Sequence, residues 1–140
     1  VYKRKERLNE IFLVMQDVNH QLFTESVLDE VLISMKEENE EKALDILKSL
    51  DLLEYRERHP VSLSGGEKQR VAVATAIASE RSVLLFDEPT SGLDYRHMLQ
   101  VARLFEKLRN HGKTILVVTH DLEFIEALHA STICLEELQA

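Results

Sequence analysis

The sequence predicts an α/β fold built on a mostly parallel β-sheet. Three apolar runs that each end on polar residues carry this prediction: residues 11–15, 83–86 and 115–118. Continuously apolar runs of this length are typical of strands in a parallel sheet covered on both faces. Segments with helical spacing lie between them, and 140 residues suffice for one domain with its own core.

Composition excludes several classes of protein. The net charge of −8 argues against a nucleic-acid binder, since duplex affinity rests on Lys and Arg. The one basic cluster, residues 3–7, is interpreted as a solvated helix end or linker. No apolar run approaches the ~20 residues that cross a bilayer. Cys134 is the single cysteine, so no internal disulfide can form, and its apolar surroundings predict a small buried side chain.

The first strand, Ile11 to Met15, ends at Gln16. Residues 24–58 then follow helical spacing on both sides of the charge run at 36–42, "KEENEEK", and predict a small helical lobe with that run as its solvated face.

The segment "SLSGGEKQRVAVATAIA" predicts a helix from Ser64 to about Ala78. Ser64 and Glu67 have the spacing of a capping box. Two glycines in the first turn, Gly65 and Gly66, weaken a helix by roughly 1 kcal/mol each relative to Ala, which favours a close approach to the backbone. A helix start with free amides and a positive dipole end predicts an anion site, with phosphate as the natural ligand.

The second strand, Val83 to Phe86, ends on Asp87 and Glu88. An aspartate at this position can hold Mg²⁺ through its water shell, and the neighbouring glutamate can polarise a water for attack on a terminal phosphate. The pair could equally cap the next turn, which residues 89–92 predict.

Helical spacing over residues 95–112 makes 83–118 a βαβ unit, whose third strand ends at Thr119 and His120. Because ligands bind beyond the carboxyl ends of parallel strands, Gln16, Asp87, Glu88 and His120 should converge there. His120 alone would be an ordinary polar strand end. A weaker strand is expected at residues 131–137, "STICLEE".

Three motifs in order, "LSGGEKQR", "VLLFDEPTSGLD" and "VVTHD", resemble the signature, Walker B with D-loop, and switch-histidine motifs of ATP-binding-cassette (ABC) ATPases. The resemblance covers nearly the whole chain from Glu10 and implies a partial P-loop NTPase fold. By this resemblance, residues 24–80 form a helical subdomain, and residues 8–16 and 81–140 form the core subdomain.

The resemblance also implies roles and ligands, with ATP and Mg²⁺ as cofactors. Gln16 resembles the Q-loop glutamine, which contacts Mg²⁺ and the attacking water, and Asp87, Glu88 and His120 resemble the metal-binding aspartate, the catalytic glutamate and the switch histidine. The residues that resemble the signature and D-loop, and are expected to contact ATP held by a second subunit, are Ser64, Gly65, Gly66, Glu67 and Asp94.

The implied partners are a second ABC ATPase subunit, identical or different, closing head to tail, and a transmembrane subunit that contacts the Q-loop and helical subdomain. The implied location is the cytoplasmic face of the membrane, with no nucleic acid bound. The stretch "MQDVNHQLFTESVLDEV" is similar to that of energy-coupling-factor and cobalt-type importers, through Gln21, Phe23 and residues 27–30.

The sequence "HGKT" at residues 111–114 is a decoy for a phosphate loop. The motif G-x-x-x-x-G-K-[ST] needs a second glycine five positions before Gly112, where Lys107 stands. Gly112 also follows a helix, which makes it a helix C′ residue. The family's strand order would leave the three strands contiguous, with the phosphate-loop strand missing between the third and residues 131–137.

We therefore expect the C-terminal part of a longer ATPase that cannot bind ATP by itself. The alternatives are a non-catalytic interaction module and a non-transport ABC ATPase. Against the latter, residues 17–63 have no room for a long coiled coil, one cysteine excludes a zinc module, and translation-factor relatives usually carry Asn-His in place of Ser91-Gly92.

Overall fold

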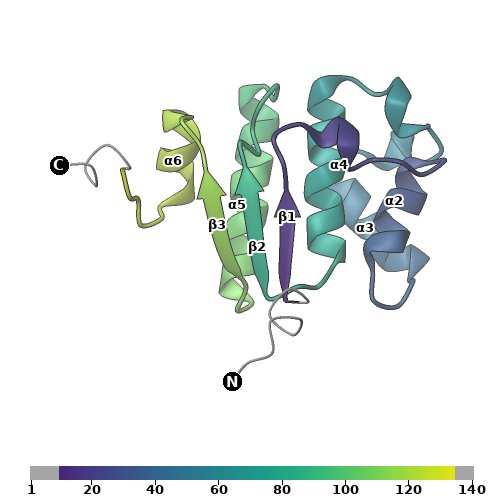
Figure 1. Cartoon of the computed structure of the whole chain (residues 1–140), viewed down its shortest axis with the longest axis horizontal. Coiled ribbons are helices and arrows are strands. Elements are labelled where there is room, and N and C mark those ends of the chain that lie inside the picture. The colour runs from purple at the N-terminus through teal and green to yellow at the C-terminus, as the bar shows by residue number, and fades with distance from the viewer. Residues whose placement is uncertain (1–9, 135–140) are drawn as a thin grey trace.

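The computed structural model describes residues 10–134. Its centre is a parallel sheet with the order β1-β2-β3 (Figure 1). The strands are β1 (Ile11–Val14), β2 (Val83–Asp87) and β3 (Thr114–Val118). The register aligns the last residue of each strand with that of its neighbour to within one position, so all three end at the same edge. The three expected strands and their contiguous order are confirmed, although the first ends one residue early.

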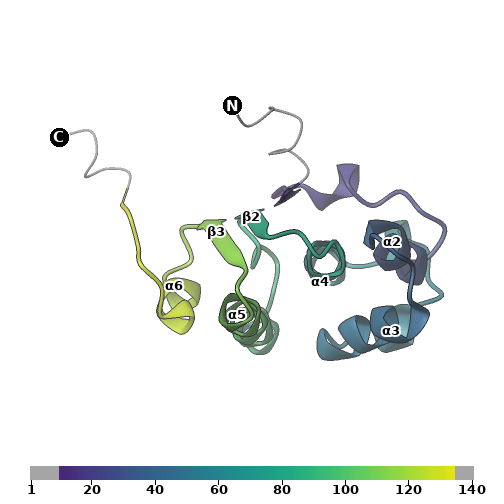
Figure 2. The ribbon, with the colours of Figure 1, turned by 90° about the horizontal axis from the view of Figure 1, so that it is seen from below.

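Helices α4 (Gly65–Ala78), α5 (Tyr95–Asn110) and α6 (Leu122–Leu128) lie on one side of the sheet (Figure 2). α4 contacts β1, and α5 contacts β3 and α6. An aromatic chain joins these layers, because Phe105 lies 4.3 Å from Phe86 and 5.9 Å from Phe124 between ring centroids. β2, α5 and β3 therefore form the expected βαβ unit.

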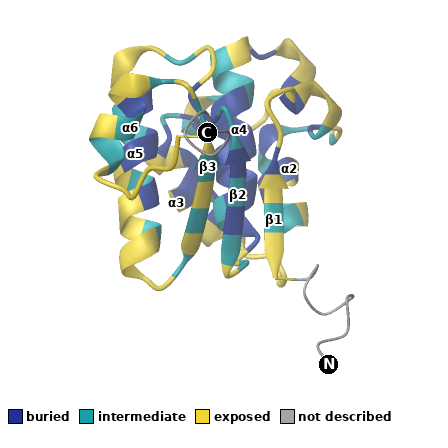
Figure 3. Cartoon of the chain, turned by 60° about the vertical axis from the view of Figure 1, so that its left-hand side comes forward, coloured by how far each residue is buried: buried dark blue, intermediate teal, exposed yellow. Residues whose placement is uncertain are grey.

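The expectation that the sheet is covered on both faces is not met within residues 10–134. Side chains alternate across a strand, and α4, α5 and α6 cover one face alone (Figure 2). On the other face, the ribbon of β1 and β3 is coloured exposed over part of its length (Figure 3). The exposed residues of these strands include Leu13 and Leu116, which are 45% and 55% exposed. The apolar runs thus predicted strands correctly, but the covering layer on this face is not supplied by residues 10–134.

The helical lobe consists of α2 (Val27–Ser34), α3 (Glu40–Ser49) and two 3₁₀ turns, η2 (Leu53–Tyr55) and η3 (Pro60–Ser62). α2 and α3 pack on each other and on α4. Residues 36–42 are all exposed, as expected of the charge run. A further 3₁₀ turn, η1 (Val18–His20), follows β1 and contacts α4. The helix α4 therefore connects the lobe to the sheet.

Two other expectations concern the segment before β3 and the segment after α6. α5 ends before Gly112, whose φ of +85° is that of a helix C′ glycine, so the decoy interpretation is confirmed. Residues 131–134 form no strand, and 135–137 lie outside the described residues. Residues 131–134 continue from α6 without regular structure and do not join the sheet. Cys134 is therefore exposed, and its predicted burial is wrong.

None of the helices within residues 10–134 is both long and apolar enough to span a bilayer.

Candidate functional site

The carboxyl ends of the three strands gather the first group of predicted site residues. Gln16 follows β1, Asp87 is the last residue of β2, and His120 follows β3 by two residues. Glu88 and His120 contact each other directly. The side chains of Gln16 and Asp87 form no hydrogen bond within residues 10–134, so the structure places them at this edge without joining them to the pair.

Glu88 is held by the turn that follows β3. Its Oε1 accepts hydrogen bonds from the backbone N–H of His120 at 3.1 Å and pairs with His120 Nδ1 at 2.6 Å, while Oε2 accepts from Thr119 Oγ1 at 3.0 Å. The Glu88 side chain is 14% exposed, whereas that of His120 is 89% exposed. The hydrogen bond and negative charge of Glu88 raise the pKa of His120 above its ordinary value. The imidazole therefore reaches into solvent while one of its nitrogens stays on the carboxylate.

The backbone of Glu88 is strained. Its φ is +49°, a conformation that costs an L-residue of order 1–3 kcal/mol. Two hydrogen bonds to the backbone groups of Glu88 hold this conformation. Its N–H donates to Val118 O at 2.8 Å, and the side-chain Nε2 of Gln69 donates to Glu88 O at 3.4 Å. The strain turns the chain sharply at the strand end and directs the carboxylate toward β3. No feature of the sequence predicts this strained backbone.

The start of α4 holds the second group. Ser64 Oγ accepts from Glu67 N–H at 3.3 Å, and Glu67 Oε2 accepts from Ser64 N–H at 2.8 Å, so the capping box is confirmed. The hydrogen bond from the Ser64 backbone lowers the pKa of Glu67. Ser64 and Glu67 thereby satisfy two of the free amides at this helix start.

The two glycines of α4 have different reasons to be glycine. A Cβ on Gly66 would lie 2.8 Å from the carbonyl oxygen of Gly92, in the turn after β2. A Cβ on Gly65 would meet nothing within 4 Å. Gly66 is therefore needed for packing inside the chain, and only Gly65 leaves the helix start open to a ligand.

Asp94 joins the same region by capping α5. Its Oδ1 accepts from the N–H of His97 at 2.9 Å and contacts His97 Nδ1 at 2.8 Å, and the backbone hydrogen bond lowers the pKa of Asp94. A hollow of about 510 Å³ opens between the two helix starts. All five residues predicted for the signature and D-loop group line it, with four others: Arg70, Gly92, Leu93 and His97.

Arg70 is a site residue that the sequence reasoning missed. It is 5% exposed, and its Nη1 donates to the carbonyl oxygens of Leu50 at 2.6 Å and Asp51 at 3.3 Å. Burial lowers its pKa. The same Asp51 accepts hydrogen bonds from Arg96 and Gln100 of α5. Arg70 thus fixes the wall of the hollow to the end of α3. Its place directly before the apolar run at residues 71–74 was the signal that could have found it.

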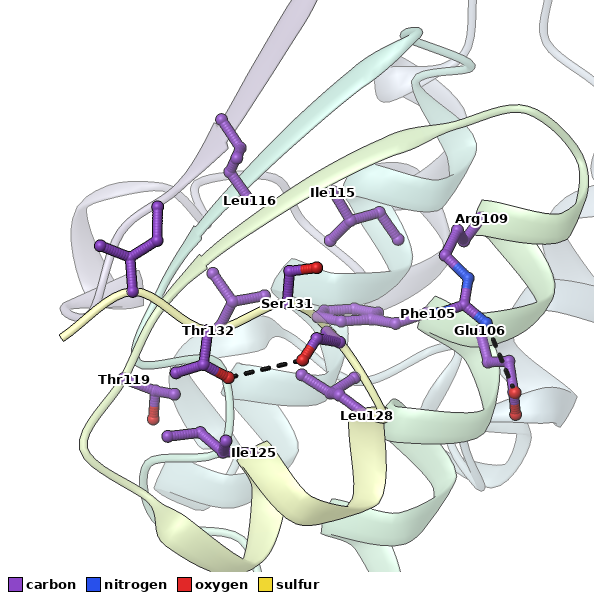
Figure 4. A pocket seen from close by; sticks show the side chains of 13 residues that line it. Phe105, Glu106, Arg109, Ile115, Leu116, Thr119, Ile125, Leu128, Ser131 and Thr132 are labelled. Carbon is purple, nitrogen blue, oxygen red and sulfur yellow. Dashed lines mark hydrogen bonds and ion pairs between the residues drawn. The ribbon is translucent and has the colours of Figure 1, made fainter.

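A second hollow of about 290 Å³ lies at the free edge of β3, between α5, α6 and residues 130–133 (Figure 4). Its lining is mainly apolar, with Phe105, Ile115 and Leu128 among the side chains. It contains none of the predicted site residues. Within residues 10–134, no cluster of three or more His, Cys, Asp or Glu side chains is arranged to hold a metal ion by itself.

Comparison with known proteins identifies ABC transporter proteins as similar to this chain. The profile of the ABC transporter family matches residues 2–91. The chain is 46% identical over 125 residues to an ABC transporter ATP-binding protein of Treponema denticola, covering 89% of this chain and 26% of that protein. It is 40% identical to the histidine/lysine/arginine/ornithine transport ATP-binding protein of Escherichia coli, covering 91% and 51%.

The chain is 36% identical to the energy-coupling factor transporter ATP-binding protein EcfA2 of Mycoplasmopsis pulmonis, covering 88% of this chain and 43% of that protein. The chain thus spans a quarter to a half of the length of these relatives. A solved structure of the archaeal ribosome recycling factor aABCE1 is similar with a TM-score of 0.75 and 33% identity, over 84% of this chain and 23% of that one. With the expected α/β fold of ABC ATPases in place, the chain belongs to the ABC transporter family.

Proposed function

We propose that these residues are the part of an ATP-hydrolysing ABC transporter subunit that carries its hydrolytic and signature groups. The observation that carries this proposal is the Glu88 carboxylate beside His120 at the ends of adjacent parallel strands. A carboxylate held there can orient a water toward a terminal phosphate, since phosphoryl transfer requires positioning more than strong proton abstraction. The exposed imidazole of His120 is free to contact that phosphate.

Asp87 and Gln16 complete the strand-end group in this proposal. Nucleotide-bound Mg²⁺ needs one or two protein carboxylates, because phosphate oxygens and waters supply its other ligands. Asp87 offers one such carboxylate at the end of β2, and the exposed amide of Gln16 follows the neighbouring strand. The residues present therefore fit Mg²⁺ that arrives with ATP. When bound, the ion would neutralise phosphate charge.

The hollow at the start of α4 serves a nucleotide bound to a second subunit. Its lining consists of residues 64–67, Arg70, residues 92–94 and His97. It excludes Asp87, Glu88 and His120. The two groups therefore face different spaces, as two subunits closing head to tail around ATP require. Free amides and the positive end of α4 favour an anion in this hollow.

The 140 residues alone are proposed not to bind ATP, because no G-x-x-x-x-G-K-[ST] motif occurs in them. Titration of Mg-ATP into the 140-residue chain, followed by calorimetry, should give no heat of tight binding. Micromolar binding would contradict this proposal.

In the full-length protein, Glu88→Gln should abolish steady-state ATP hydrolysis while ATP binding remains. The matched control is Glu106→Gln, which changes an exposed glutamate of α5 that pairs with Arg109. An unchanged turnover in the Glu88 variant would rule out its assigned role.

The membrane partner is proposed to contact a hollow of about 410 Å³ beside β1 and α2. Phe23 and Ile33 line it and are 74% and 59% exposed, and the segment from Gln21 to Glu30 carries the similarity to energy-coupling-factor importers. We propose that a transmembrane subunit of such an importer docks here, which would hold the chain at the cytoplasmic face of the membrane. Loss of co-purification with the transmembrane subunit in Phe23→Ser, with Val61→Ser as an exposed control, would support this surface.

The runner-up is a non-catalytic interaction module, or a non-transport ABC ATPase. Its supporting observations are the missing phosphate-loop motif and the similarity to a ribosome recycling factor. Full-length protein that binds no ATP would favour the module over the enzyme.

A further inference from the structure

β1 is an edge strand of the sheet formed by residues 10–134. Val83 N–H donates to Glu10 O at 3.0 Å, so the backbone groups of Glu10 face β2. Because successive residues of a strand direct their backbone groups to opposite sides, those of Leu13 and Met15 face the free edge. An open strand edge of this kind would be left with unpaired polar groups.

The side chain of Gln21 occupies this edge. Its Nε2 donates to Leu13 O at 2.8 Å, and its Oε1 accepts from Met15 N–H at 2.9 Å. A residue on a parallel neighbouring strand would bond to these same two groups, which flank Val14. A carboxamide places one of its N–H donors beside its oxygen acceptor. The N–H and C=O groups of a single strand residue point to one side in the same way, so the carboxamide reproduces that pattern.

We infer that Gln21 is a positioning residue that completes the β1 edge in place of another strand and thereby fixes the start of the Gln16 loop. Gln16 directly follows Met15, whose N–H the Gln21 carboxamide holds. The functional half of this inference rests on the role proposed for Gln16, whereas the structural half does not.

The far end of the loop is fixed in a similar way. Glu30, which is 2% exposed, accepts hydrogen bonds from the backbone N–H groups of Phe23 and of Thr24, the latter at 2.6 Å. Two side chains that bind backbone groups thus anchor the segment between Met15 and Thr24 at both ends. Gln16 lies exposed between these anchors, so its position depends on them rather than on contacts of its own.

Hydrogen exchange of the Met15 amide, measured by NMR on the 140-residue chain, tests the structural half. Gln21→Leu keeps the size of the side chain and removes both hydrogen bonds, so the protection of Met15 should fall by about tenfold. Gln100→Leu removes a carboxamide of α5 and should leave Met15 protection unchanged. Unchanged protection in Gln21→Leu would overturn the inference.

Gln21→Glu provides a second variant if the leucine variant does not fold. At neutral pH its carboxylate has no donor for Leu13 O and sets a negatively charged oxygen against that carbonyl. This repulsion should push the side chain away from the strand edge, so Met15 protection should fall. At a pH below the pKa of this carboxyl group, the neutral acid again offers a donor and an acceptor, and the protection factor should recover. A protection factor that does not depend on pH in this variant would also count against the inference.

ATP hydrolysis by the full-length protein tests the functional half. Gln21→Leu should lower kcat by about tenfold or more, because misplacing a reacting group is costly, and leave KM for ATP nearly unchanged. If kcat is unchanged although Met15 protection is lost, Gln21 does not position Gln16 for hydrolysis, and only its contact with the edge of β1 is supported. Absence of hydrolysis in the unmodified protein would refute the proposed function, and Met15 exchange would still decide the structural half.

Discussion

Glu88 combines a positive φ with a carboxylate that accepts hydrogen bonds from two consecutive residues at the end of another strand. The backbone strain and the side-chain contacts support each other, because the sharp turn at Glu88 directs its side chain toward Thr119 and His120. The sequence identified Glu88 and His120 through their place after apolar runs. It could not predict their direct contact, which depends on the register between β2 and β3.

The pKa of His120 should depend on Glu88. In Glu88→Gln the amide can still accept a hydrogen bond, but the negative charge is gone, so the pKa of His120 should fall toward about 6.5. Asp121 makes a smaller contribution of the same sign and remains in the variant. An NMR titration of the His120 ring measures this pKa directly, and Glu106→Gln should leave it unchanged.

The same shift makes stability depend on pH. The folded-state pKa of His120 is raised, so its contribution to stability is fully present below the unfolded pKa of about 6.5 and is lost as pH rises through the folded value. Urea unfolding should therefore show Glu88→Gln to be less stable than the unmodified chain at a pH below the unfolded pKa of His120. At a pH above its folded pKa, the difference in the free energy of unfolding should be smaller. A difference that grows with pH would contradict the assigned ion pair.

At the scale of elements, α4 was predictable because its signals are local. Ser64 and Glu67 mark its start by spacing alone, and Gly112 marks the end of α5 in the same way. The reason for Gly66 was not local, because it lies in the carbonyl group of Gly92, 26 residues further along the chain. Contacts between elements of this kind leave no periodic trace in a sequence.

Alanine at the two glycines of α4 should therefore have opposite consequences. Gly66→Ala brings a Cβ against backbone, which cannot move aside cheaply, and should lower the free energy of unfolding by about 1–3 kcal/mol. Gly65→Ala enters open space and replaces a residue that weakens a helix, so it should leave the free energy of unfolding unchanged or raise it by up to about 1 kcal/mol. Urea unfolding followed by circular dichroism measures both, and equal costs would show that α4 and the turn at Gly92 are not packed this closely.

At the scale of the whole molecule, the chain has one covered and one exposed face of its sheet (Figure 3). The sequence predicted apolar side chains on both faces of the sheet, and the strands carry apolar side chains on both faces. It could not say which faces residues 10–134 would cover, because that depends on the side from which α4, α5 and α6 return to the sheet. Exposed apolar faces of this kind mark contact surfaces.

Two leucines in adjacent strands test this arrangement. Leu84 is 1% exposed and lies in the core, whereas Leu116 is 55% exposed on the open face. Leu84→Ala should lower the free energy of unfolding of the 140-residue chain by about 2–5 kcal/mol, because it leaves a cavity. Leu116→Ala removes atoms that are already largely in water and should cost less than about 1 kcal/mol. Urea unfolding gives both values.

The exposed face should also bind an apolar dye. Replacing Leu13 and Leu116 together by threonine should reduce the fluorescence of bound anilinonaphthalene sulfonate, because it removes two of the exposed apolar side chains while threonine keeps a β-branched shape suited to a strand. Sedimentation velocity at several protein concentrations completes the test. If Leu116→Ala costs as much as Leu84→Ala while the chain sediments as a monomer, the open face is folded against something within the same chain, and the described arrangement of the sheet is wrong.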